Sequence, residues 1–282
     1  MQKRIDRSVI ITIVLLLITS ITGILSMNFD HKWVFTNQYG HTVEMYGYGI
    51  YANDTYLKAP INIGTDWIIL LLVIPILVVS YIQFYKNDCT LNRLKMASIY
   101  GVITYYAASI CFGVTYNQLF LVYAVLFGIS LFKTFIYTRA ISLKKVPKVR
   151  ISMTIFLYIL GGSLFVAWLP DIIPAVLNNT TLSSIGVYTT EITYVIDMAI
   201  VSPLIFISLY LLKKRNPLGA IIYDIILELC VVVGIIVISQ SIIQMLSHVE
   251  MPLPVMITKV GIFVVLGGFA LYFRNKLHKE IA

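Results

Sequence analysis

Five acidic side chains lie in or beside long apolar stretches of the chain, where a charge is costly and needs a partner: Asp66, Glu191, Asp197, Asp224 and Glu228. Asp197 is the clearest, about two turns into an apolar stretch. Thr190, Thr193 and Asp197 recur at i, i+3 and i+7, which predicts a shared helical face. Pro203 follows and frees a backbone carbonyl. The pattern predicts a kinked helix whose carboxylate binds a cation or a polar ligand; the alternative is a polar clamp to a neighbouring helix.

Lys259 is the basic residue best placed to meet this carboxylate. It lies in the last apolar stretch, at a depth similar to that of Asp197 if both helices cross one membrane. We therefore predict that the two side chains form an ion pair, which requires a separation of about 4 Å.

Asp224 and Glu228 form an i, i+4 acidic pair near one end of another apolar stretch. Two carboxylates on one helical face can bind a cation or share a proton. The favoured alternative for Asp224 is an ion pair with the basic cluster 213–215. Gln240 and Gln244, on roughly the opposite face, predict hydrogen bonds between helices.

Composition identifies the elements that must carry these groups. The chain has 282 residues, of which 59% are hydrophobic and only 12% charged. A soluble domain is about 25% charged, so the excess apolar surface must face lipid. The formal charge of +8 does not indicate nucleic-acid binding, because the basic residues form short clusters between apolar stretches.

About eight apolar stretches are long enough to cross a bilayer as helices. We expect one all-α polytopic membrane domain over residues 1–282, a bundle of about eight transmembrane helices with a small hairpin-like outer loop. The first stretch lacks a small-x-small cleavage site, which favours a retained helix over a signal peptide. The predicted spans are 9–27, 67–85, 96–114, 119–137, 151–169, 192–212, 220–246 and 255–272.

The basic residues predict the orientation of these spans. With the N-terminus inside, the inner segments hold 17 of the 21 lysines and arginines, whereas the outer loops hold only Lys32 and Lys58. Cytoplasmic loops carry such an excess. We therefore expect a multi-pass protein of the cytoplasmic membrane with both termini in the cytoplasm.

The outer loop 28–66 is too long to be a simple turn. Two short β-type stretches, 34–36 and 42–46, flank Asn37-Gln38-Tyr39-Gly40, which predicts a β-hairpin. The loop either caps the outer helix ends or contributes to a binding pocket. The second outer loop, 170–190, is polar.

Familiar enzyme motifs are absent from the chain. There is no HExxH, Walker, GxSxG or dinucleotide-binding sequence. The four histidines fall in segments predicted as loops and tails, and the three cysteines show no CxxC spacing. We expect no metal and no cofactor, and the sequence favours a protein that is not an enzyme.

Several segments together resemble a widespread family of uncharacterised bacterial multi-pass membrane proteins. The resemblance covers about residues 34–250 and implies the architecture and a bacterial origin, but no activity. It rests on Glu44–Tyr51, Asp54, Gly64–Asp66, Tyr116–Phe120, Thr190–Asp197 with Pro203, and Arg215–Gly219.

The predicted topology places most of these polar residues at the outer face. They either converge on one outward-facing pocket or merely cap loops in the same leaflet. The candidate ligand-binding residues are Tyr46, Tyr48, Asp54, Asp66, Tyr116, Asn117, Thr190, Glu191, Thr193, Asp197 and Lys259; Asp224 and Glu228 form a separate inner acidic pair.

Three functions are compatible with this pattern. The first is a transporter or binder of a small cationic or polar ligand. The second is a non-transporting sensor or assembly subunit that uses loop 28–66 as its contact surface. The third and least supported is a lipid-modifying membrane enzyme. The expected partners are the lipid bilayer and the small ligand, without nucleic acid, and the oligomeric state stays open.

Overall fold

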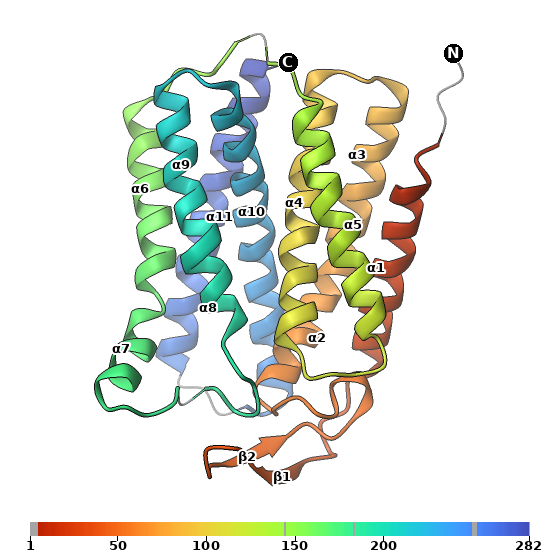
Figure 1. Ribbon diagram of the computed structural model, residues 1–282, viewed down its shortest axis with the longest axis vertical. Helices are drawn as coiled ribbons and strands as arrows, with labels where there is room; N and C mark the ends of the chain where they lie inside the picture. The colour runs from red at the N-terminus through yellow and green to blue at the C-terminus, as the bar shows by residue number, and fades with distance from the viewer. Residues whose placement is uncertain (1–4, 144, 183, 250–252, 282) are drawn as a thin grey trace.

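Long helices arranged side by side form the body of the protein (Figure 1). The structure is a computed structural model that describes residues 5–143, 145–182, 184–249 and 253–281, apart from the side chains of 253–259. Eight helical segments in this part of the chain are long and apolar enough to cross a membrane. The predicted all-α architecture with about eight spans is therefore confirmed.

The first four spans are built from five α-helices. The second span is interrupted by a π-helical segment at Ile69–Val73, so it consists of two α-helices. The helices are α1 Arg7–Leu25, α2 Lys58–Ile68, α3 Ile74–Lys86, α4 Thr90–Gly113 and α5 Phe120–Arg139.

The last four spans contain a similar interruption. A π-helical segment at Asp197–Val201 divides the sixth span, and a short helix prolongs the fifth. The helices are α6 Ile151–Val166, α7 Leu169–Leu177, α8 Ile192–Ile196, α9 Ser202–Lys213, α10 Pro217–Leu246 and α11 Leu253–Ile281.

Four helical segments extend well beyond their predicted limits, including α4, which begins at Thr90 and not at residue 96. The second span starts at Lys58, so Asp66 lies within α2 and not at the end of a loop. The stretch 58–66 is too polar to register as membrane helix, although Pro60 is tolerated in a first helical turn. Similarly, α7 occupies part of the predicted loop 170–190, and α11 continues to Ile281.

The predicted β-hairpin is present. Strands β1 Trp33–Thr36 and β2 Thr42–Met45 pair antiparallel, with Phe35 opposite Val43. Gly40 has φ +81° in the connecting turn, a conformation that glycine adopts without strain. The side chain of Asn37 closes the turn, because its Oδ1 accepts hydrogen bonds from the backbone of Tyr39 and His41.

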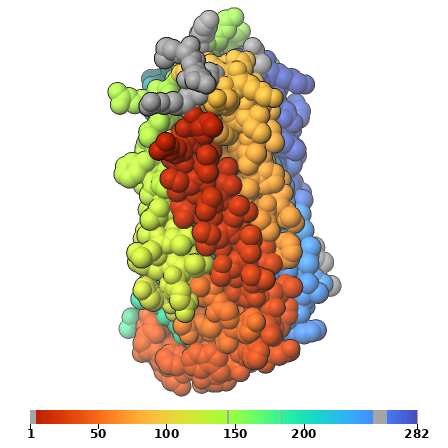
Figure 2. Space-filling model, turned by 90° about the vertical axis from the view of Figure 1, so that its right-hand side faces the viewer, coloured from red at the N-terminus to blue at the C-terminus, as the bar shows by residue number. Residues whose placement is uncertain are grey.

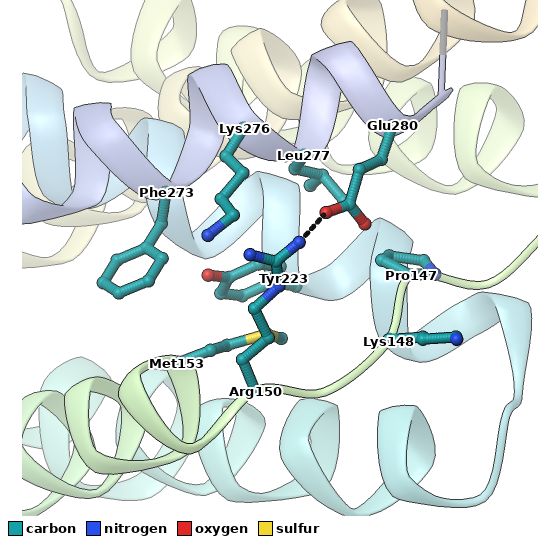
Figure 3. Close-up of a pocket in the computed structure, with 9 residues that line it drawn as sticks. All are labelled: Pro147, Lys148, Arg150, Met153, Tyr223, Phe273, Lys276, Leu277 and Glu280. Carbon is teal, nitrogen blue, oxygen red and sulfur yellow. Dashed lines mark hydrogen bonds and ion pairs between the residues drawn. The ribbon is translucent and has the colours of Figure 1, made fainter.

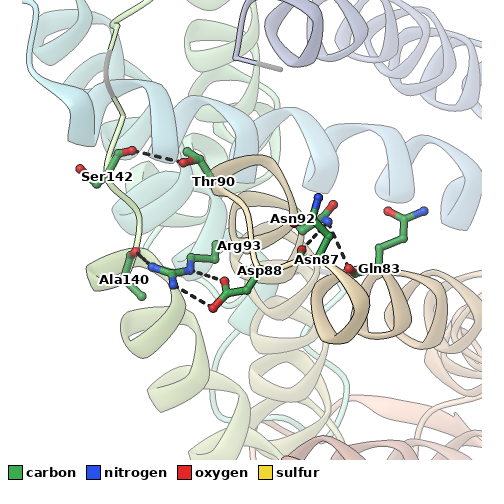
Figure 4. Close-up of polar contacts among 8 residues, drawn as sticks. All are labelled: Gln83, Asn87, Asp88, Thr90, Asn92, Arg93, Ala140 and Ser142. Carbon is green, nitrogen blue, oxygen red and sulfur yellow. Dashed lines mark hydrogen bonds and ion pairs between the residues drawn. The ribbon is translucent and has the colours of Figure 1, made fainter. Parts of the chain in front are cut away.

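The two ends of the bundle differ. The hairpin lies at one end, the hairpin end, whereas α1 begins and α11 finishes at the opposite end, the terminal end (Figure 1). Arg93 fixes two connections at the terminal end (Figure 4). Its guanidinium pairs with Asp88 at 2.6 Å and donates to the carbonyl of Ala140 at 2.6 Å.

The helices form two groups that meet at α4 and α10 (Figure 1). One apolar core lies among α1, α3, α4 and α5 and includes Leu16, Leu77 and Tyr100. A second lies among α6, α9, α10 and α11 and includes Leu157 and Ile205. Helix α1 lies on the surface between α3 and α5 (Figure 2).

Candidate functional site

Asp66 occupies a fully enclosed position in α2. Its side chain is buried, and its two carboxylate oxygens accept hydrogen bonds from Tyr51 at 2.6 Å and from Tyr106 at 2.7 Å. Gly23 of α1 lies against the carboxylate, where a Cβ atom would collide with it. Two tyrosines and one glycine therefore build a close-fitting site for a single carboxylate.

Asp197 is the second carboxylate in the transmembrane region. It opens the π-helical segment of the sixth span and is 4% exposed. Tyr105 donates to its Oδ1 at 3.0 Å, and the indole N–H of Trp168 donates to its Oδ2 at 3.2 Å. Within the described part of the chain, the donors to this acid are thus again neutral.

Helix α4 connects the two carboxylates. Tyr105 and Tyr106 are consecutive, and consecutive helical residues point about 100° apart. Tyr105 therefore reaches Asp197 in the second group of helices, while Tyr106 reaches Asp66 in the first. One turn of α4 contacts both acids.

The interruptions in the second and sixth spans are equivalent. The π-helical segments start at residues 69 and 197, and a proline follows each at residues 75 and 203, so each pair is 128 residues apart. The burial pattern repeats at the same spacing: Ile69, Val73, Ile74, Leu77 and Ser80 match Asp197, Val201, Ser202, Ile205 and Ser208.

Helix packing follows the same repeat. Helix α5 packs along α4 as α11 packs along α10, and α4 contacts α8 as α10 contacts α2. The chain therefore consists of two related four-helix halves, divided between α5 and α6. The acids are close to equivalent but not identical: Asp66 precedes its π-helical segment, whereas Asp197 opens one.

Asp54 lies in the loop before α2, at the hairpin end. Its Oδ1 accepts hydrogen bonds from the backbone and hydroxyl of Thr115, both at 2.9 Å, and from Tyr188 at 2.8 Å. Among the described atoms its buried Oδ2 has no hydrogen-bond partner. Burial raises the pKa of Asp54 to about 6, although these donors offset part of the rise.

Glu191 forms an ion pair with Lys58. The Lys58 ammonium lies 2.6 Å from Oε2 of Glu191 and 5.4 Å from the ring centre of Tyr188. The pair joins the start of α2 to the residue before α8, and so connects the two halves at the hairpin end. Thr190 precedes the helix that begins at Ile192, so the predicted helical face of Thr190 with Asp197 does not form.

The other predicted outer residues have different surroundings. Tyr46 is buried and donates to the carbonyl of Ser26, and Asn117 accepts from the backbone of Leu119 in the turn before α5. Tyr48 stacks on His31 and is 38% exposed, Tyr116 is 76% exposed, and Thr193 is half-buried. The candidates thus occupy several separate environments.

The predicted pairing of Asp197 with Lys259 lies outside the described residues, because the side chain of Lys259 is not among them. The partners of Asp197 within the described part are Tyr105 and Trp168.

The inner acidic pair lies near the terminal end of α10. Asp224 accepts from Ser98 and contacts His278, both at 2.7 Å, and Arg274 pairs with Glu228. The predicted pairing of Asp224 with residues 213–215 is wrong, because α11 continues beyond its apolar stretch and brings its basic residues alongside α10. For the same reason His278 lies on a helix and not in a tail.

The residues that sequence analysis missed are hydrogen-bond donors to the acids: Tyr51, Ser98, Tyr105, Tyr106, Thr115, Trp168 and Tyr188. Tyr105-Tyr106 within an apolar stretch was an available signal, because a buried tyrosine hydroxyl requires a partner. The predicted interhelical role of Gln240 is confirmed by its hydrogen bond to Thr65 at 2.8 Å.

The described residues contain no group of three or more histidine, cysteine or acidic side chains that could hold a metal ion. Comparison of the chain with protein-family models, curated proteins and solved structures finds no match. The protein is a multi-pass helical membrane protein with buried acids at two interrupted helices. A proposal for its function therefore rests on this geometry.

Proposed function

We propose that this protein is a membrane transporter in which Asp66 and Asp197 carry a coupling proton while a small cationic or polar solute moves. The observation that carries the proposal is the pair of equivalent helix interruptions, each beside a buried carboxylate. π-Helical turns occur frequently at functional sites. Transporters built from related halves bind ions and substrates at discontinuous helices.

The surroundings of the two acids suit proton uptake and release. Within the described part of the chain neither acid has a basic ion-pair partner. A lone charge within a membrane is costly, so a proton or cation supplied from outside stabilises the site. A tyrosine hydroxyl can both donate and accept, and Tyr106 can therefore remain bonded to Asp66 in either protonation state.

Contacts at both ends hold the two halves together. Lys58–Glu191 and Asp54–Tyr188 join them at the hairpin end, and Ser98–Asp224 joins them nearer the terminal end. Since Asp66 is fully buried, a proton reaches it only after helices move. Breaking one set of contacts while the other persists would open the acids to one side at a time.

The proposed location is the cytoplasmic membrane of a bacterium, with both termini in the cytoplasm. The support is the concentration of lysine and arginine at the terminal end together with the family resemblance. In this orientation the hairpin end faces outward.

The test measures electrical currents from proteoliposomes on a solid support. Pools of amino acids, polyamines and quaternary ammonium compounds serve as probes, with and without an imposed pH gradient. We expect one pool to give a current that depends on the pH gradient and falls at least tenfold in Asp66→Asn and in Asp197→Asn. Asp30→Asn, which changes an exposed acid at the hairpin end, is the matched control. Undiminished currents in both buried variants would refute the assignment.

A second function, recognition of an external ligand or partner, is favoured by one observation. An open groove of about 1310 Å³ lies between the hairpin and residues 179–182 and 184–186, and is lined by polar groups that include His41, Thr180 and His248. In this case the helices anchor a receptor or an assembly subunit. Replacement of residues 34–60 by a flexible linker would abolish capture of a stable partner; a partner that stays bound would contradict this role.

A further inference from the structure

A small hollow at the terminal end is separate from the two buried acids and from the proposed transport function. It lies where α6, α10 and α11 meet, beside the segment that leads into α6 (Figure 3). Its volume is about 20 Å³, enough for one water-sized group. A single oxygen atom of a larger ligand fits, whereas a whole metabolite does not.

Three basic residues are among those that line this hollow. Lys148 and Arg150 come from the segment before α6, and Lys276 comes from α11 (Figure 3). Arg150 is partly neutralised by Glu280 at 3.4 Å. In the described part of the chain Lys148 and Lys276 form no ion pair, so the site has a net charge of two positive units.

Tyr223 of α10 provides an independent indication of a ligand. Its side chain is 2% exposed and lines the hollow. Among the described atoms its hydroxyl has no hydrogen-bond partner. A buried hydroxyl without a partner is costly, so an acceptor oxygen in the hollow would stabilise it.

The surface next to the hollow is apolar. Ile151 is 80% exposed at the start of α6, and Phe269 and Tyr272 are exposed on α11. Ile151 and Phe269 belong to helices that are apolar enough to lie in the membrane. A ligand that places an anionic oxygen in the hollow therefore has its remaining atoms beside a lipid-facing surface.

We propose that this hollow binds the phosphate of an anionic phospholipid. A phosphate oxygen accepts from Tyr223, Lys148 and Lys276 neutralise the phosphate, and the acyl chains lie over Ile151 and Phe269. Basic pockets between membrane helices bind anionic headgroups in this way.

Native mass spectrometry of the purified full-length protein tests the site. Phosphatidylglycerol and phosphatidylcholine are added in separate titrations, and inorganic phosphate is added as a competitor. We expect one tightly bound phosphatidylglycerol that inorganic phosphate does not displace. The Lys148→Gln/Lys276→Gln variant should bind it about 25-fold more weakly, at about fivefold for each lysine.

Two further variants separate binding from folding. Tyr223→Phe keeps the ring and should weaken phosphatidylglycerol binding about tenfold through the lost hydrogen bond to a charged group. Lys213→Gln/Lys214→Gln removes the same charge from another helix of the terminal end and should bind the lipid as the wild type does. Equal binding by the wild type and both pocket variants would overturn the proposal, as would equal retention of phosphatidylcholine. Displacement by inorganic phosphate would overturn the lipid assignment.

Discussion

At the scale of single residues, Asp54 makes a pH-dependent contribution to the free energy of unfolding, and this contribution can be measured by substituting Asp54 alone. Its pKa is raised to about 6 from 3.8 because its carboxylate is buried at the hairpin end. The folded protein therefore binds more protons than the unfolded chain between these values. The contribution of protonated Asp54 to the stability of the folded protein is fully present below pH 3.8 and is lost as the pH rises through about 6.

We expect the thermal unfolding temperature of the wild type to fall with pH over this window more steeply than that of Asp54→Asn. The difference corresponds to about 3 kcal/mol, at about 1.4 kcal/mol per pKa unit. Asp6 does not interfere, because burial raises its pKa less than the hydrogen bonds with Lys133 and Ser8 lower it, so it titrates below pH 3.8. Identical slopes for the wild type and the variant would contradict the assignment.

The contact of Gly23 with the Asp66 carboxylate predicts how a substitution at Gly23 changes the stability of the protein. A Cβ atom on Gly23 would collide with the Asp66 carboxylate, which two tyrosines hold in place. We expect Gly23→Ala to destabilise the protein by about 1–3 kcal/mol through overpacking, seen as a lower thermal unfolding temperature.

Gly128→Ala is the matched control for this substitution, because nothing lies within 4 Å of the added Cβ atom. The double variant Gly23→Ala/Asp66→Ser should regain part of the loss, since the shorter side chain leaves space. A Gly23→Ala protein as stable as Gly128→Ala would mean that α1 can move away from Asp66 at little cost.

At the scale of helices, the two interrupted spans explain how a membrane helix can change shape. A π-helical turn accommodates one extra residue and weakens the regular hydrogen-bond pattern. Pro75 and Pro203, which lack an N–H group, each lie two residues after the end of a π-helical segment. Each interruption is therefore a place where α2 can tilt relative to α3, or α8 relative to α9.

Deletion of Leu71 tests this interpretation. Leu71 lies in the first π-helical segment and is 62% exposed, so its removal leaves a regular turn without disturbing the core. We expect the variant to insert and to keep its thermal stability, because the flanking helices retain their relative rotation. The proton-dependent current should fall at least tenfold in the proteoliposome assay, because the tilt is lost.

Deletion of Leu126, a buried residue of the uninterrupted helix α5, is the comparison. It rotates the two parts of α5 against each other by about 100° and should lower both stability and transport. Undiminished transport after deletion of Leu71 would exclude the π-helical segment as a functional hinge.

At the scale of the whole molecule, the orientation in the membrane is a prediction that labelling can check. In a background with Cys89, Cys111 and Cys230 replaced by serine, single cysteines are introduced as Thr180→Cys at the hairpin end and Lys86→Cys at the terminal end. Both positions are exposed. A membrane-impermeant maleimide should label the first in intact cells and the second only after lysis; the reverse pattern would invert the topology.

The number of spans and the hairpin can be predicted from the sequence. These features follow from local properties: apolar stretches of membrane length, and turn residues between two β-type segments. The sequence also identified Asp66, Asp197, Asp224 and Glu228 as side chains that need partners, because burial of a charge is costly wherever it occurs.

The identity of those partners depends on how the helices pack. The donors to Asp66 come from residues 51 and 106, and those to Asp197 from residues 105 and 168. These donors are far from the acids in sequence, so they meet only if their helices become neighbours. Apolar periodicity does not specify which helices are neighbours, because lipid and protein interior are equally apolar. The equivalence of the two halves depends on packing in the same way, because only the packed helices place the two π-helical segments in matching surroundings, the first beside α1 and the second beside α6.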